Sequence, residues 1–138
     1  MSRVAVETIE GKRILLVEDH EDSAEILRLF LEAEGCQVQW APTAAAALAA
    51  FDGRRRPPPD LVLLDLTLPD LDGVELGRRL RALPQPPPVL LLSGKSQHAL
   101  SGAAATVDAV GYVRKPFSAG GLLDAVAAAL ERRTSAIP

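Results

Sequence analysis

The sequence contains a single cysteine, Cys36, and lacks any long uncharged apolar run. One cysteine cannot form an internal disulfide, which argues against a disulfide-stapled secreted domain, and we expect Cys36 to be buried and inert. No stretch approaches the roughly 20 apolar residues needed to cross a bilayer, and no signal-peptide core follows Met1. The net charge of −3 offers no broad basic surface for nucleic acid. We therefore expect a cytoplasmic protein without a membrane or direct nucleic-acid partner.

What the sequence does contain is enough apolar material for one folded domain. Hydrophobic residues make up 48% of the 138 residues and charged residues 24%, which is ordinary for a globular protein. We expect residues 1–11 to form a loose leader, residues 12–133 the domain and residues 134–138 a tail. The arginine triplet at 54–56, followed by Pro57–Pro59, indicates a charged surface loop, with a phosphate or nucleic-acid patch as the alternative.

Short apolar runs alternate with segments of helical spacing along the chain. The predicted strands are residues 13–17, 36–40, 61–65, 89–93 and 109–113. The predicted helices are residues 23–34, 44–51, 73–83, 97–105 and 119–133, with Thr43 and Asp72 as caps. Five βα repeats with short connections predict an α/β fold of flavodoxin-like topology: a five-stranded parallel sheet with helices on both faces.

Chemically active side chains follow the ends of the predicted strands. Glu18 and Asp19 follow the first strand, Asp65 ends the third, Ser93 ends the fourth and Lys115 follows the fifth. Because the carboxyl ends of parallel strands share one edge, we expect these side chains to converge there. Packed carboxylates repel one another, and a hard cation such as Mg²⁺ would relieve that repulsion. An Asp beside Mg²⁺, an ammonium group and a hydroxyl group is equipped to accept a phosphoryl group.

Four short motifs, in this order, carry a family resemblance. They are Leu16-Val17-Glu18-Asp19, then Asp65-xxx-Pro69-Asp70-xx-Gly73, then Ser93-Gly94, and finally Tyr112 through Phe117. Over about residues 12–133 the chain resembles a response-regulator receiver domain of two-component signalling. The resemblance implies a signalling domain in a phosphorelay rather than an enzyme with a separate substrate.

The resemblance also implies the parts of the site. Asp65 would be the phosphoacceptor for a histidine kinase or a histidine phosphotransfer protein. Mg²⁺ would be bound by Asp19, by Asp65 and by the backbone carbonyl of Thr67, with Glu18 acting through water. Ser93 would bind a phosphoryl oxygen and change its contacts on activation.

Further implied features lie in the last motif. Lys115 would bind another phosphoryl oxygen, and the Lys115–Pro116 peptide bond would be cis. Tyr112 matches an aromatic residue that changes rotamer on activation, with an ordinary core tyrosine as the alternative. We expect His20, at a variable loop position, to be exposed.

Two other classes of protein use similar strand-end groups. A haloacid-dehalogenase-type phosphatase needs a second acid two residues after its nucleophile, where this chain has Thr67. A flavodoxin-like cofactor binder needs a phosphate loop after its first strand, where Glu18 and Asp19 would repel phosphate. Within the receiver interpretation, the domain could stand alone or belong to a longer chain such as a hybrid histidine kinase.

Two helices are candidates for signal output. The helix at 23–34 has an inward stripe of Ala24, Leu27 and Leu31, yet its apolar arc extends further and includes Ile26, which predicts a partner or homodimer surface. The helix at 97–105 has few large apolar side chains and a central glycine, which predicts a weakly held element that responds to phosphorylation and passes the signal to a downstream protein.

Overall fold

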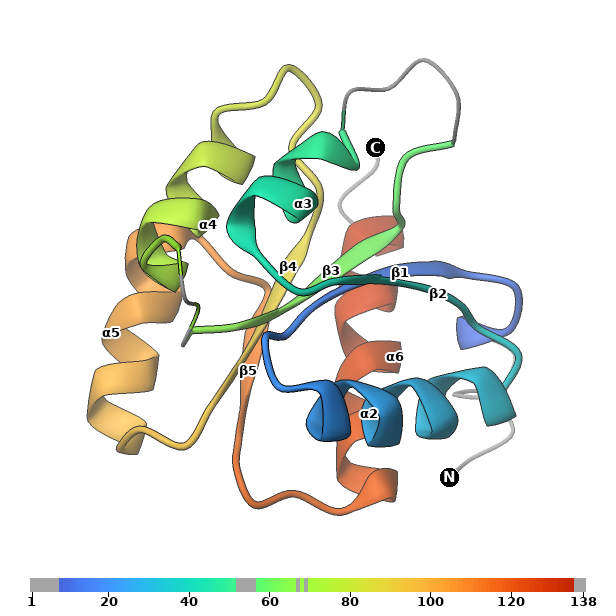
Figure 1. The fold of residues 1–138 in the computed structure, drawn as a ribbon. Helices are drawn as coiled ribbons and strands as arrows, with labels where there is room; N and C mark the ends of the chain where they lie inside the picture. The colour runs from blue at the N-terminus through green and yellow to red at the C-terminus, as the bar shows by residue number, and fades with distance from the viewer. Residues whose placement is uncertain (1–7, 52–56, 67, 69, 136–138) are drawn as a thin grey trace.

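Five parallel strands form the centre of the computed structural model, which describes residues 8–51, 57–66, 68 and 70–135 (Figure 1). The strands are β1 (Arg13–Val17), β2 (Gln37–Ala41), β3 (Leu61–Asp65), β4 (Val89–Ser93) and β5 (Gly111–Arg114). Their order in the sheet is β2-β1-β3-β4-β5, so β3 is the central strand. The predicted five-stranded parallel sheet is confirmed.

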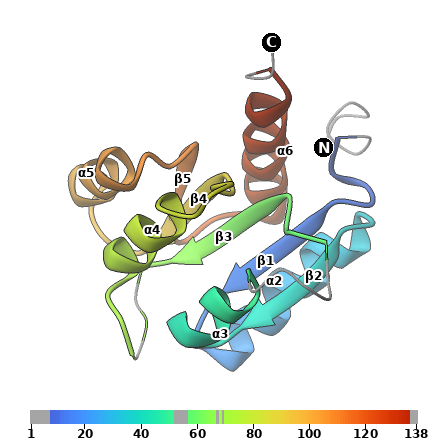
Figure 2. The same cartoon turned by 90° about the horizontal axis from the view of Figure 1, so that it is seen from above.

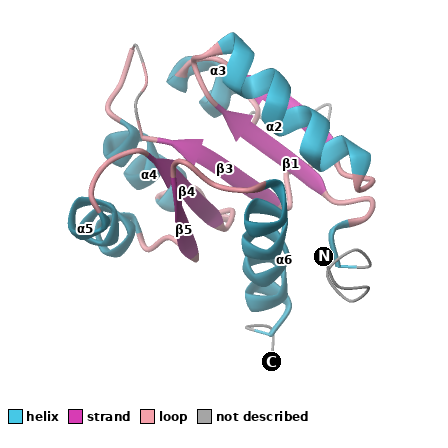
Figure 3. Ribbon diagram, turned by 90° about the horizontal axis from the view of Figure 1, so that it is seen from below, coloured by secondary structure: helices cyan, strands magenta, loops and turns pink. Residues whose placement is uncertain are grey.

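Helices cover both faces of this sheet, as predicted (Figures 1 and 2). They are α2 (Glu21–Ala33), α3 (Ala44–Ala49), α4 (Gly73–Arg81), α5 (Gln97–Val107) and α6 (Ala119–Ser135). Figure 3 shows α2 and α6 on one side of the strands and α4 and α5 on the other. Within the described ranges, no helix has the length and apolar character to cross a membrane.

The central strands are buried on both faces, which explains their nearly continuous apolar sequences. Successive side chains of a strand point to opposite faces. Ile14 and Leu16 of β1 therefore join the core beneath α2 and α6, whereas Leu15 and Val17 join the core beneath α3, α4 and α5. All five residues of β3 are buried, including its last residue, Asp65.

The predicted caps are present, and the element ends differ by a few residues from the predicted ones. The Thr43 hydroxyl accepts a hydrogen bond from the Ala46 N–H at 3.1 Å, and the Asp72 carboxylate accepts one from the Val74 N–H at 2.7 Å. Helix α5 continues past the predicted end at 105, because Val107 is buried and Asp108 then takes a left-handed conformation with φ 54°.

The described part of the leader is packed rather than loose, contrary to our expectation. The Ile9 side chain is fully buried in the core beneath α2 and α6. The Ile9 carbonyl accepts a hydrogen bond from the buried Cys36 thiol at 3.4 Å, and the Gly11 N–H donates to the Gly35 carbonyl at 2.8 Å. Gly35 has a φ of +90°, which favours glycine at this turn. Residues 8–11 thus complete one end of the core.

Candidate functional site

The carboxyl ends of β1, β3, β4 and β5 bring the predicted reactive residues to one edge of the sheet. Asp65 ends β3 and pairs in register with Leu92 of β4, and Ser93 pairs in turn with Arg114 of β5. The Lys115 N–H donates to the Ser93 carbonyl at 2.8 Å, which fixes the start of the segment after β5. The predicted convergence of these strand ends follows directly from the parallel register.

A buried acid pair and one lysine form the centre of this edge. The Lys115 Nζ lies 2.5 Å from an Asp65 carboxylate oxygen and 3.6 Å from the Glu18 Oε2. The Asp65 and Glu18 side chains are only 6% and 2% exposed, whereas that of Lys115 is 32% exposed. The ammonium group is thus held against two carboxyls that solvent barely reaches, while one side of it remains open.

The pKa of Glu18 reflects both its burial and the acid beside it. This pKa is raised from 4.5 to about 7, chiefly by burial and in addition by a hydrogen bond with Asp65 and by the charge of Asp65. The Lys115 charge and the His20 N–H lower it, but by less. For Lys115, burial lowers the pKa, yet its contacts with Asp65 and Glu18 outweigh that effect and raise it overall. A second positive charge would therefore stabilise the ionised acid pair.

The residues fit a divalent cation in their chemistry. The Glu18 Oε2 is a buried oxygen with no hydrogen-bond partner among the described residues, and Asp65 lies beside it. Asp19 follows Glu18 directly and is exposed. Within the described ranges, however, no three His, Cys, Asp or Glu side chains are already gathered as a metal site. Thr67, the predicted carbonyl ligand, lies outside the described residues.

The turn that carries the two predicted metal-binding acids is held by several hydrogen bonds. The Trp40 indole N–H donates to the Glu18 carbonyl at 2.7 Å, and the His20 N–H donates to the Glu18 Oε1 at 3.2 Å. His20 itself is exposed, as expected, and its side chain does not cap α2. The contact from Trp40 was not predicted, because nothing in the sequence links the end of β2 to the end of β1.

Ser93 has the geometry of a hydroxyl ready to donate. Its side chain is 2% exposed, and its Oγ accepts a hydrogen bond from the Lys95 N–H at 3.0 Å. A hydroxyl that already accepts has its own proton available for another partner. Tyr112 on β5 is half-buried and packs against the core beneath α3, α4 and α5. The implied cis Lys115–Pro116 bond is present.

Asp70, in the loop after β3, reaches across to a different helix. Its carboxylate oxygens accept hydrogen bonds from the Ala44 N–H at 2.9 Å and from the Ala45 N–H at 3.1 Å. These backbone hydrogen bonds lower the pKa of Asp70. The loop that follows Asp65 is thereby attached to the start of α3. This capping across the fold was also missed, since a cap is recognised in sequence only next to its own helix.

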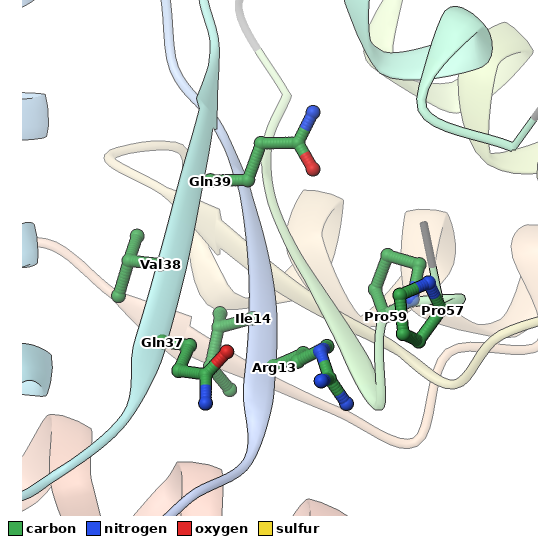
Figure 4. Close-up of a pocket in the computed structure, with 7 residues that line it drawn as sticks. All are labelled: Arg13, Ile14, Gln37, Val38, Gln39, Pro57 and Pro59. Atoms are coloured by element: carbon green, nitrogen blue, oxygen red, sulfur yellow. The ribbon is translucent and has the colours of Figure 1, made fainter. Parts of the chain in front are cut away.

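A pocket of about 330 Å³ lies at the opposite end of the sheet and takes no part in this site (Figure 4). It is lined by Arg13, Ile14, Gln37, Val38, Gln39, Pro57 and Pro59. These residues belong to the beginnings of β1 and β2 and to the segment before β3, whereas Asp65 is at the carboxyl end of β3.

Comparisons with known proteins agree with this arrangement. Residues 14–127 match the family model of the response regulator receiver domain. The chain is 38% identical over 122 residues to the KDP operon transcriptional regulatory protein KdpE of Escherichia coli, covering 88% of this chain and 52% of that protein. It is 36% identical over 110 residues to the transcriptional regulatory protein CreB of the same organism, covering 80% of this chain and 47% of that protein. The chain therefore spans about half the length of the curated relatives it matches.

Solved structures show the same fold. A CheY-like response regulator receiver domain protein from Methanospirillum hungatei superposes with a TM-score of 0.81 at 28% identity, covering 91% of this chain and 98% of that one. A putative response regulator from Chloroflexus aurantiacus also superposes with a TM-score of 0.81, at 30% identity, covering 89% of this chain and 100% of that one. With its strand order, its strand-end acids and lysine, and a family match over most of its length, the chain belongs to the response regulator receiver domains of two-component signalling.

Proposed function

We propose that this receiver domain accepts a phosphoryl group on Asp65 from the phosphohistidine of a histidine kinase or histidine phosphotransfer protein. The observation that supports this most is the contact of the Lys115 ammonium group with the nearly buried Asp65 carboxylate and with Glu18. A structural aspartate at a strand end would need neither the lysine nor a second buried acid. The proposed site of action is the cytoplasm, since the curated relatives are transcriptional regulators.

The proposed transfer requires one bond to form as another breaks. An Asp65 carboxylate oxygen attacks the phosphorus atom, the N–P bond of the phosphohistidine breaks, and its electron pair returns to the imidazole. The Lys115 ammonium group and the Ser93 hydroxyl then donate hydrogen bonds to phosphoryl oxygens, because both lie at the same edge as Asp65. Asp19, Asp65 and the Thr67 carbonyl, with Glu18 acting through water, would hold Mg²⁺, which would supply positive charge to offset that of the carboxylates and the phosphoryl group.

The domain would act on itself rather than on a separate substrate. The product is a mixed anhydride on Asp65, and water attack at its phosphorus atom returns the free carboxylate and inorganic phosphate. The domain thereby assists only its own phosphorylation and dephosphorylation. It is a signalling domain whose phosphorylated state has a limited lifetime, and it does not turn over a separate substrate.

Intact mass spectrometry with a small phosphodonor tests the acceptor assignment. With acetyl phosphate or phosphoramidate and Mg²⁺, the wild-type chain should gain one phosphoryl group, and Asp65→Asn should gain none. Asp124→Asn, an exposed substitution on α6, is the matched control and should label like wild type. Equal labelling of Asp65→Asn and wild type would refute the assignment.

For the partner, we propose that α2 provides the surface on which the kinase or phosphotransfer protein docks. Ala24, Leu27 and Leu31 face the core, as predicted, whereas Ile26 is 51% exposed and Leu29 is 61% exposed. Helix α2 begins three residues after Glu18, so a protein bound along it would lie close to the acid pair. Large exposed apolar side chains beside a reactive edge fit a transient protein contact.

The Ile26→Glu variant tests this surface. It should slow phosphotransfer from a phosphorylated kinase at least tenfold while labelling by acetyl phosphate stays unchanged, because a small donor needs no docking surface. Arg28→Glu, on the polar strip of the same helix, is the control for added charge. If Ile26→Glu instead abolishes self-association and leaves phosphotransfer intact, α2 is a homodimer surface and the docking proposal is wrong.

A further inference from the structure

The indole N–H of Trp40 is aimed at the turn that carries the acids. It donates to the Glu18 carbonyl at 2.7 Å, a short distance for an N–H donor and a neutral oxygen. Trp40 is the only tryptophan of the chain and belongs to β2, the strand beside β1. Its ring is half-buried against the core beneath α2 and α6, so the N–H has a fixed direction.

Other hydrogen bonds fix the remaining groups of the same turn. The Glu18 N–H donates to the Ala41 carbonyl at 3.2 Å, and the Ala24 N–H donates to the His20 carbonyl at 2.9 Å. The His20 N–H donates to the Glu18 Oε1 at 3.2 Å. Asp19, which is exposed, therefore lies between a carbonyl fixed by Trp40 and an amide fixed by the carboxyl of Glu18.

The backbone on either side of the Asp19 side chain is held by these two groups. Rotation about the bonds on either side of the peptide that joins Glu18 to Asp19 would change where the Asp19 side chain can reach. The Glu18 carbonyl is the oxygen of that peptide, so the hydrogen bond from Trp40 opposes the rotation. Outer hydrogen bonds of this kind typically contribute 10- to 100-fold to metal affinity, because they hold the direct ligands in place.

We propose that Trp40 is a positioning residue that orients the Glu18–Asp19 peptide for Mg²⁺ binding. The proposal rests on the proposed function for the role of Mg²⁺, but the positioning itself is a property of the metal-free protein. Trp40 is not among the residues proposed to bind the metal or the phosphoryl group. Its effect is to fix the peptide from which the Asp19 side chain starts, directly after the buried Glu18.

An ordinary structural role would have a different signature. If the hydrogen bond from the indole N–H contributed only to the stability of the fold, removing the N–H would lower the free energy of unfolding. The Mg²⁺ affinity of the folded protein would then be unchanged. A positioning role lowers the affinity of protein that is still folded. The two roles are separated by measuring both quantities on the same variant.

The sharpest perturbation removes the N–H and keeps the ring. Because Trp40 is the only tryptophan, a tryptophan auxotroph supplied with benzothienylalanine replaces this one residue by an isostere that has sulfur in place of the N–H. Trp40→Phe is the second variant. Val38→Ala, on the same face of β2 and packed against the same core, is the control for lost packing without a lost donor.

Calorimetric titration with MgCl₂ gives the first readout. Both Trp40 variants should bind Mg²⁺ about tenfold more weakly than wild type, and the Val38→Ala control should match wild type even where it unfolds at a lower temperature. Unchanged affinity in the benzothienylalanine protein would overturn the positioning role. Wild-type protein that binds no Mg²⁺ would refute the metal part of the proposed function instead.

Amide hydrogen exchange of the metal-free protein gives a readout that does not depend on Mg²⁺. Loss of the Trp40 donor should speed exchange at the His20 amide at least tenfold relative to the amides of β3, since the turn is then held less firmly. Unchanged exchange at His20 would overturn the proposal even if Mg²⁺ affinity fell. Faster exchange in a protein that binds no Mg²⁺ would leave the positioning role standing and reject the metal.

Discussion

The pKa of Glu18 predicts that the metal-free domain loses stability as the pH rises through neutrality. Its pKa is raised to about 7 in the folded chain from its ordinary 4.5. Between these values the folded state holds a proton that the unfolded state has lost, so the free energy of unfolding falls as the pH increases. The effect is absent below about pH 4.5 and complete above about pH 7.

The size of the effect follows from the same two values. A change from 4.5 to about 7 corresponds to at most about 3 kcal/mol. The proton is shared with the neighbouring Asp65, so the titration step belongs to the pair. For a domain whose whole stability is on the order of 5–15 kcal/mol, this is a large fraction.

Other groups with shifted pKa values act outside this window. The pKa of Asp70 is lowered, so its stabilising effect is present above the ordinary value of 3.8 and is lost only in acid. The pKa of Lys115 is raised from 10.5, and burial raises that of Cys36 from 9.0 to about 11. The contributions of these two groups to the free energy of unfolding therefore change only at alkaline pH. Among these groups, only Glu18 titrates near neutral pH.

Urea unfolding of wild type and Glu18→Gln at about pH 5 and about pH 8 measures the effect. Glutamine has the shape of the protonated acid, so the two proteins should be about equally stable at the lower pH. At the higher pH the variant should be more stable by up to about 3 kcal/mol. Adding Mg²⁺ at the higher pH should stabilise wild type more than the variant. An equal pH dependence of both proteins would refute the reasoning.

Three further predictions concern the frame around the site. Ile9→Ala should lower the free energy of unfolding by about 2–5 kcal/mol because Ile9 is fully buried, whereas Ile26→Ala, at a position 51% exposed, should change it by less than about 1 kcal/mol in urea unfolding. Gly102→Ala should raise the free energy of unfolding by roughly 1 kcal/mol, because nothing lies near the added methyl group. Gly73→Ala should lower it, because the methyl group would lie 2.6 Å from the backbone of Leu66. Amide hydrogen exchange in α5 should be faster than in α4 and should slow on addition of beryllofluoride; slow exchange unaffected by beryllofluoride would place the switch elsewhere.

The sheet and the reactive residues could be predicted from the sequence because their signals are local. A buried strand such as Leu61–Asp65 is a continuous apolar run, and the parallel arrangement follows from the alternation of strands and helices. Once the sheet is parallel, its strand ends share an edge. The positions of Glu18, Asp65 and Lys115 then follow without any knowledge of side-chain packing.

The hydrogen bonds that hold the site could not be predicted, because they join segments far apart in sequence. Trp40 contacts Glu18 across 22 residues, and Asp70 contacts Ala44 across 26. Neither residue type has a spacing rule that would point to its partner. The burial of Ile9 was missed for a related reason, since a lone apolar residue in a mixed segment has no periodicity.

The end of α5 was misjudged because its anchor lies beyond the weak stretch. Residues 97–105 contain one large apolar side chain, Leu100, and the sequence suggested a loosely held helix. The structure adds Val107, which is 2% exposed and lies so close to Gly77 of α4 that a methyl group there would come within 2.7 Å of it. The amino-terminal turn of α5, by contrast, is exposed throughout residues 97–99.

These attachments indicate which part of the domain is free to respond to a charge at Asp65. The loop after β3 is joined to α3 by two hydrogen bonds to the ionised Asp70, and such charge-assisted bonds are roughly twice as strong as neutral ones. The turn that carries Glu18 and Asp19 is joined to β2 by the hydrogen bond from the Trp40 indole to the Glu18 carbonyl. Both neighbours of the site are therefore held to other elements. The first three residues of α5 follow Ser93 closely and are exposed, and the buried side chains of this helix, Leu100 and Val107, come after them. A new hydrogen bond from the Ser93 hydroxyl to a phosphoryl oxygen would thus meet least resistance at residues 97–99, so we expect α5 to move first at its amino-terminal end, with the buried Leu100 and Val107 as the fixed points.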